Sequence, residues 1–218
     1  MRTVLRRVII VLAVIALWGA LRLTVLSDAG VDESAGLATL RVIDGRVELS
    51  RGGATFERVD STADVDVGTK VRSGDDALAE IEYFDGSFTR IGPDTTYEIV
   101  GLDGSPNRSV IVGKIGLGET FHDVKDLTGS GSRFEVQESN AIAAVRGTRF
   151  AARCVPPLPC GIAVVEGVVE VTPSSGDPVS VEAGHRVTID DDGILGEVTE
   201  VSPDDPWLNR NQDLDGAS

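Results

Sequence analysis

The residues of this chain with the most evident chemistry are two cysteines, Cys154 and Cys160, in the stretch CVPPLPC. Outside the cytoplasm such a pair oxidises, and the three prolines between the cysteines stiffen the loop that the bond closes. We therefore predict a structural disulfide, which contributes about 2 kcal/mol because the loop is short. A redox-active pair is less well supported, since the spacing differs from CxxC and no βαβ pattern surrounds it.

The two histidines, His122 and His185, leave few ways to build an active site. The GxSxG, HExxH, P-loop and GxGxxG motifs are all missing from the sequence. We interpret both histidines as ordinary surface or edge residues, and two cysteines without further ligands do not make a metal site. The sequence thus predicts no catalytic residue, no metal and no cofactor, in a protein that is not an enzyme.

Charge is unevenly distributed along the chain, whose formal net charge is -15. Four of the 20 basic residues lie in the first 26 positions, and none of the 35 acidic residues does. The remainder is strongly acidic, which argues against nucleic acid as a partner because phosphate binding needs a basic surface. Solubility outside the cell explains this acidity, and a cationic partner is the alternative.

A mostly apolar segment, residues 8–26, follows three N-terminal arginines and contains a single charge, Arg22. At about 1.5 Å per residue, a helix of this length just spans the hydrocarbon core of a membrane. The positive-inside rule places the stub 1–7 in the cytoplasm and the chain after a polar linker, residues 27–36, outside it. We therefore predict a single-pass protein of the cell membrane. The alternative is a cleaved signal peptide, although the Ser-Asp-Ala sequence after the segment is a poor cleavage site.

From residue 37 onward the sequence favours short strands separated by turns. Residues 79–83 alternate apolar and acidic side chains with a period of two, and Asp85-Gly86 follows as a hairpin signal. No amphipathic helix of ten or more residues is evident. We predict an all-β sandwich or roll of roughly ten or more short strands over residues 37–200, preceded by one N-terminal transmembrane helix. Residues 201–218 are interpreted as a polar, mobile tail, apart from Trp207 and Leu208.

Four stretches together resemble the FecR-like domain family. They are residues 67–81, residues 85–95, residues 134–136 with 141–150, and residues 164–171 with 181–184. The combination of an Asp-Gly-Ser turn with the later run RGT-x-F is the most specific part of this resemblance. The motif residues that it singles out, as structural or interaction positions, are Asp85, Gly86, Ser87, Arg146, Gly147, Thr148 and Phe150.

The physical interpretation of these motif residues is mainly structural. Asp85-Gly86 forms a tight turn, Gly147 permits a bend, and Phe150 returns the chain to the core. For Arg146 we expect an ion pair or a carbonyl contact within the fold, with contact to a partner as the alternative.

The resemblance implies an exported all-β domain on a bacterial membrane helix. The best-known members bind a sigma factor through a cytoplasmic segment and sense an outer-membrane iron transporter, but the stub 1–7 is too short for such a segment. We expect a non-enzymatic, membrane-anchored binding or sensing module of the envelope, whose partner is a protein or an envelope polymer and which signals through that partner. A structural or scaffold protein of the cell envelope is the alternative.

Overall fold

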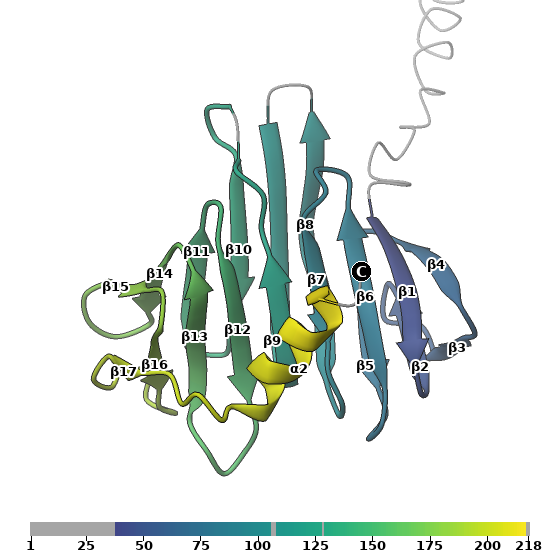
Figure 1. Ribbon diagram of the computed structural model, residues 1–218. Helices are drawn as coiled ribbons and strands as arrows, with labels where there is room; N and C mark the ends of the chain where they lie inside the picture. Colours follow the sequence, from purple (N-terminus) through teal and green to yellow (C-terminus); the bar gives the residue numbers. More distant parts are fainter. Residues whose placement is uncertain (1–37, 106–107, 128, 217–218) are drawn as a thin grey trace, which may run out of the picture. The chain divides into compact units, whose positions relative to one another are not determined.

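Two β-sheets packed face to face make up the described part of the protein. The computed structural model describes residues 38–105, 108–127 and 129–216, and its 17 strands form one continuous hydrogen-bonded network. The pairings divide into two rows that share a single strand, β9 (Arg108–Asp123) (Figure 1). One buried apolar cluster contains residues of both rows, so the rows are the two layers of a sandwich. The predicted all-β fold class is therefore confirmed.

The first row is named the helix-covered sheet, because helix α2 (Pro206–Gly216) lies on its outer face. Its strands are, in spatial order, β4 (Thr62–Val65), β1 (Ala38–Asp44), β6 (Leu78–Tyr83), β7 (Phe88–Ile91), β9, β12 (Arg149–Cys154), β13 (Cys160–Glu166), β16 (His185–Ile189) and β17 (Thr199–Glu200). The second sheet has the order β3 (Glu57–Val59), β2 (Val47–Arg51), β5 (Thr69–Ser73), β8 (Thr96–Ser105), β9, β10 (Arg133–Gln137), β11 (Ala141–Val145), β14 (Val168–Pro173) and β15 (Val179–Glu182).

Strand β9 is long enough to belong to both sheets. Its first part pairs with β8 and, in parallel, with β10, whereas residues 118–123 pair with β12 and residues 120–123 with β7. The chain passes between sheets at Gly118, whose φ of 97° is one that glycine adopts without strain. A Cβ atom at this position would lie 2.2 Å from Oγ1 of Thr95, so the close approach of the β7–β8 turn also requires glycine.

His122 lies in the core, and its interpretation as a surface or edge residue was wrong. The side chain is 0% exposed and stacks on Phe150, with ring centroids 4.6 Å apart. Its Nδ1 and Nε2 atoms each lie 2.9 Å from a hydroxyl, of Thr89 and Thr120 respectively. A neutral imidazole donates from one nitrogen and accepts at the other, so both contacts are satisfied. Burial lowers the pKa of His122 to about 3, which keeps the ring neutral.

Helix α2 corrects the prediction of a polar, mobile tail for residues 201–218. Asp205 caps the helix, because its Oδ1 accepts the N–H groups of Trp207 and Leu208, each at 3.0 Å, and Pro206 occupies the first helical position. The Trp207 side chain is 4% exposed, and its indole N–H donates to the carbonyl oxygen of Thr120 at 3.2 Å. The helix was not predicted because it is short and its docked face combines only three apolar residues, Trp207, Leu208 and Leu214, with the polar Asn211, so its apolar period is weak.

Ion pairs hold the second half of α2 against the helix-covered sheet. Arg90, which is buried, places Nη1 2.7 Å from Oδ1 of Asp215 and Nε 2.9 Å from Oε2 of Glu80. The same guanidinium donates to the carbonyl oxygen of Asn211 at 3.3 Å, and Arg149 also pairs with Asp215. Because burying charges costs solvation energy, these pairs chiefly determine where the helix docks and contribute less to net stability.

No helix within the described residues is long and apolar enough to cross a membrane. The predicted stub 1–7, transmembrane helix 8–26 and linker 27–36 lie outside the residues that the structure describes. These assignments stay predictions. The sandwich itself belongs to a compact unit, Ser34–Ser218.

Replacing Trp207 with alanine should release α2 and destabilise the protein. The change removes a buried indole and its hydrogen bond, and truncating a buried aromatic residue costs about 3–5 kcal/mol. Urea unfolding of the unit Ser34–Ser218 measures the loss. Gln212→Ala, on the exposed face of the same helix, is the matched control and should alter the free energy of unfolding by less than about 0.5 kcal/mol. Equal effects of the two substitutions would contradict the role of the indole.

The burial of His122 predicts that stability falls as the pH drops below its ordinary pKa of 6.5. Between pH 6.5 and about pH 3 the unfolded chain binds a proton that the folded one does not, which costs up to about 1.4 kcal/mol per pH unit. His122→Gln keeps polar contacts to both threonines without titrating, so it should flatten this part of the profile. Urea midpoints at about pH 4 and about pH 7 provide the comparison. An identical profile in the variant would refute the assignment.

Candidate functional site

The Asp-Gly-Ser turn joins β6 to β7 as the predicted hairpin. Gly86 has a φ of 80°, and Oδ1 of Asp85 accepts the N–H of Ser87 at 2.9 Å. The other carboxylate oxygen of Asp85 accepts the hydroxyl of Ser109 at 2.9 Å, while the buried hydroxyl of Ser87 accepts the N–H of Lys125 at 3.1 Å. The turn is thereby tied both to β9 and to the segment that follows β9.

The Arg-Gly-Thr corner, residues 146–148, carries the chain from β11 in the second sheet to β12 in the helix-covered sheet. Gly147 has a φ of 61°, and a Cβ atom there would lie 2.2 Å from Oδ1 of Asp126. The carbonyl oxygen of Thr148 accepts the N–H of Val124 at 2.9 Å. Phe150, two residues further on, is fully buried in the core.

The two motifs, far apart in the sequence, meet at the segment after β9. Consecutive amides of that segment are shared between them, because Val124 donates to Thr148 and Lys125 donates to Ser87. The arrangement follows from topology, since β7 and β12 flank the end of β9 on either side. The motif residues therefore brace this segment, and none of them lines the groove described below.

Arg146 differs from the expectation of an ion pair or carbonyl contact. The corner places this residue at the surface, and no hydrogen bond or ion pair joins it to any residue that the structure describes. Contact with a partner, the alternative interpretation, stays a prediction.

Cys154 and Cys160 form the predicted disulfide. The bond closes the loop between β12 and β13, residues 155–159. Leu158, in this loop, is 65% exposed and is the most exposed large apolar side chain among the described residues. The cross-link holds Leu158 at the rim of a groove.

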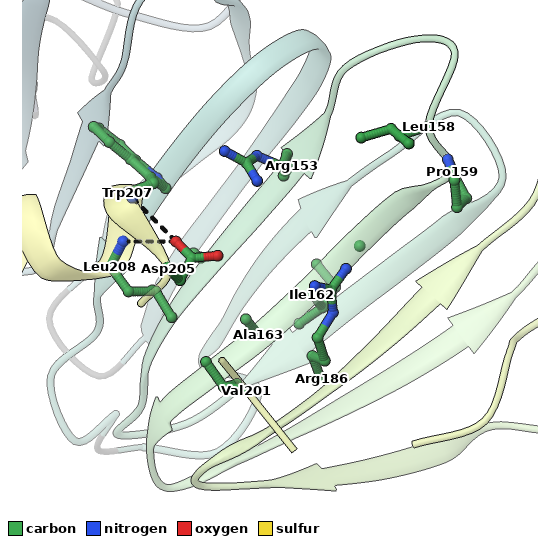
Figure 2. A pocket seen from close by; sticks show the side chains of 12 residues that line it. Arg153, Leu158, Pro159, Ile162, Ala163, Arg186, Val201, Asp205, Trp207 and Leu208 are labelled. Carbon is green, nitrogen blue, oxygen red and sulfur yellow. Dashed lines mark hydrogen bonds between the residues drawn. The ribbon is translucent and has the colours of Figure 1, made fainter. Parts of the chain in front are cut away.

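This groove, named the α2 groove, has a volume of about 320 Å³ and lies between α2 and strands β12, β13 and β16 (Figure 2). Trp207 and Leu208 form its helix side, and Leu158 closes one end. Gly161 lies in the floor, where a Cβ atom would approach the carbonyl oxygen of Val187 to 3.3 Å. Small and apolar side chains complete the surface: Ala151, Ala163, Val201 and Pro159. The volume falls in the range of small-ligand and side-chain pockets.

Two arginines supply the polar groups of the α2 groove, and they differ in their partners. Arg153 forms an ion pair with Glu119. Arg186 pairs with no carboxylate among the residues that the structure describes, and Asp205 is occupied in capping α2. The groove thus combines an unneutralised guanidinium with an apolar wall. Such a combination binds a carboxylate through the guanidinium and a neighbouring apolar group through the wall.

The α2 groove was not predicted from the sequence. Its components come from three strands, one loop and a helix that are separated in the chain, and nothing in their spacing brings them together. One usable signal was present: Asp205-Pro206 is a capping residue followed by proline, which is typical of a helix start just before Trp207.

One cluster among the described residues brings metal-ligating atoms together. Single ligand atoms of Glu138, Cys154 and Cys160 lie within 4.8 Å of one another. Both sulfurs belong to the disulfide, so neither is a thiolate ligand in this state. That the protein uses no metal, cofactor or catalytic residue stays a prediction.

Comparison with known proteins supports the fold and the motifs. Residues 69–170 match the family model described as "FecR protein". Two crystal structures of a "putative anti-sigma factor" from Parabacteroides distasonis ATCC 8503 are similar, each with a TM-score of 0.52 at 15% identity. The match covers 64% of this chain and 64% and 63% of those chains, so it spans less than two thirds of their length. At this identity the likeness concerns the fold alone.

No curated protein matches the chain. The family assignment rests on the matched region, which contains both the Asp-Gly-Ser turn and the Arg-Gly-Thr corner. The match of residues 69–170 to the FecR model confirms the resemblance that those motifs predicted.

Proposed function

We propose that this chain is a non-enzymatic binding and sensing module of a bacterial envelope. Residues 8–26 tether it to the cell membrane, and the FecR domain lies outside the cytoplasm. Three observations support this proposal: the arginine-flanked apolar segment, the family match over residues 69–170, and the disulfide, which is typical of oxidising compartments. The two structures of similar fold are described as those of a "putative anti-sigma factor", which supports a regulatory role in signalling through a partner.

The observation that carries the binding function is the α2 groove. Its guanidinium from Arg186 has no carboxylate partner among the described residues, in a protein with a net charge of -15. The exposed Leu158 at the rim adds apolar surface. The occupant that fits is a segment of a partner protein with a carboxylate next to an apolar side chain, because each half of that segment finds a complementary surface.

Charge reversal in the groove should weaken partner binding. With a photo-reactive benzoylphenylalanine at position 158, we expect a discrete protein adduct in intact cells. Adding Arg186→Glu should reduce the adduct by about tenfold, because the carboxylate of the partner then meets a like charge. Arg58→Glu is the matched control: Arg58 is exposed on β3, outside the groove, and its reversal should leave the adduct unchanged. Equal effects of the two reversals, or adducts with wall polymer alone, would favour the envelope scaffold.

Charges placed within residues 8–26 should release the protein from the membrane. Each arginine at the centre of a transmembrane helix costs about 2.5–3.5 kcal/mol, so Leu12→Arg with Ile15→Arg makes insertion unfavourable. Membrane fractionation of cells that express an N-terminally tagged chain measures the change. Leu12→Val with Ile15→Val, which retains the apolar segment, should stay in the membrane fraction. Loss of the tag from the unaltered chain would instead indicate a cleaved signal peptide.

A further inference from the structure

Glu138 is a buried carboxyl group without a hydrogen-bond partner. It follows directly after β10, is 6% exposed, and neither carboxyl oxygen contacts a donor or acceptor among the described residues. A buried polar group that makes no hydrogen bond costs about 1–3 kcal/mol of stability. The fold thus retains a destabilising buried carboxyl group at position 138. Packing does not explain why an acidic residue lies there.

The carboxyl group of Glu138 lies beside the disulfide. One of its oxygens and the Sγ atoms of Cys154 and Cys160 lie within 4.8 Å of one another. Cys154 is buried, whereas Cys160 is half-buried, so the two sulfurs differ in access to solvent. All three residues line a pocket of about 160 Å³, which gives a small molecule or a proton a path to them.

Burial keeps Glu138 in its protonated form at neutral pH. Burial raises the pKa of Glu138 to about 8, so the carboxylic acid is the main form at neutral pH. The other titratable groups that line the pocket are Asp190 and Asp191, both acidic, and no basic residue is among its lining. Oδ1 of Asp190 is engaged by the N–H groups of Asp192 and Ile194. No cationic side chain in this lining opposes the effect of burial on Glu138.

We propose that Glu138 exchanges a proton with Cys154 during thiol–disulfide exchange, so that the Cys154–Cys160 pair is a redox site for a dithiol partner. The geometry assigns the roles. The half-buried Cys160 sulfur is the one that a thiolate can reach, and the buried Cys154 sulfur is the leaving group. A thiolate released in an apolar setting is poorly solvated, and a protonated carboxyl group beside it removes that cost.

The exchange begins when a thiolate of the dithiol attacks Sγ of Cys160. A mixed disulfide forms, the Cys154–Cys160 bond breaks, and its electron pair passes to Sγ of Cys154. Glu138 gives its proton to that sulfur and becomes a carboxylate. The second thiol of the dithiol, as a thiolate, then attacks its own mixed disulfide and releases Cys160 as a thiolate, which takes a proton from water. Two electrons and two protons have passed from the dithiol to the protein, and Glu138 recovers its proton through the pocket.

Reduction by dithiothreitol, followed by trapping of the released thiols, tests this role on the full chain. Rates are measured from about pH 6 to about pH 9.5 and divided by the thiolate fraction of the reductant. For the unaltered protein the corrected rate should be constant below pH 8 and fall as Glu138 ionises near its pKa of about 8. Glu138→Gln should react about tenfold more slowly at pH 7, with no such fall. Glu135→Gln, on β10 of the same sheet, is the matched control and should behave like the unaltered protein.

A structural role for Glu138 makes a different prediction. It would alter the rate by the same factor at every pH and leave the shape of the profile unchanged. Glu138→Asp, which keeps an acid but shortens its reach, serves as the second variant if Glu138→Gln does not fold, and it should be slower while retaining the fall at alkaline pH. A flat profile for the unaltered protein, or equal rates for it and a folded Glu138 variant, overturns the proposal. The measurement involves no partner of the α2 groove, so its result is independent of the proposed function.

Discussion

The passage of β9 from one sheet to the other is the constraint on which the rest of the structure depends. It requires Gly118, because a side chain there would overlap the hydroxyl of Thr95. That hydroxyl also accepts the N–H of Glu119 at 2.9 Å, so the same contact that excludes a Cβ atom anchors the crossing. Beyond this point β9 presents His122 to the core and Phe121 to the outer face, as alternation along a strand demands.

Each of these two side chains determines a property of the sheet face on which it lies. His122 stays neutral between two threonine hydroxyls, and burial lowers its pKa to about 3, so acid destabilises the centre of the sandwich. Phe121 gives the outer face an apolar patch on which Trp207 docks. Because α2 then stands away from β13 and β16, the α2 groove remains between them. The α2 groove is therefore a consequence of covering an apolar patch with a short helix.

Local features of the chain were predictable, and long-range ones were not. Alternation and Asp85-Gly86 predicted the β6–β7 hairpin, and two cysteines around three prolines predicted the disulfide, because each depends on neighbouring residues. Placing His122 and α2 required knowing what lies across the sheet. Glu138 was indistinguishable from a solvent-exposed acid, since its burial comes from the disulfide loop and from the residues after β16. The α2 groove could not be foreseen for the same reason.

The disulfide loop is where the two candidate sites meet. Leu158 lines both the α2 groove and the pocket that holds Glu138, so one side chain is shared between a binding surface and a redox pair. The bond between Cys154 and Cys160 restricts this loop, and reduction of the bond would remove that restriction. Opening it would leave the strands of the sandwich paired, because β12 and β13 are held by their own ladder. The loss of order would thus be confined to one wall of the α2 groove, the wall on which the proposed partner segment would lie.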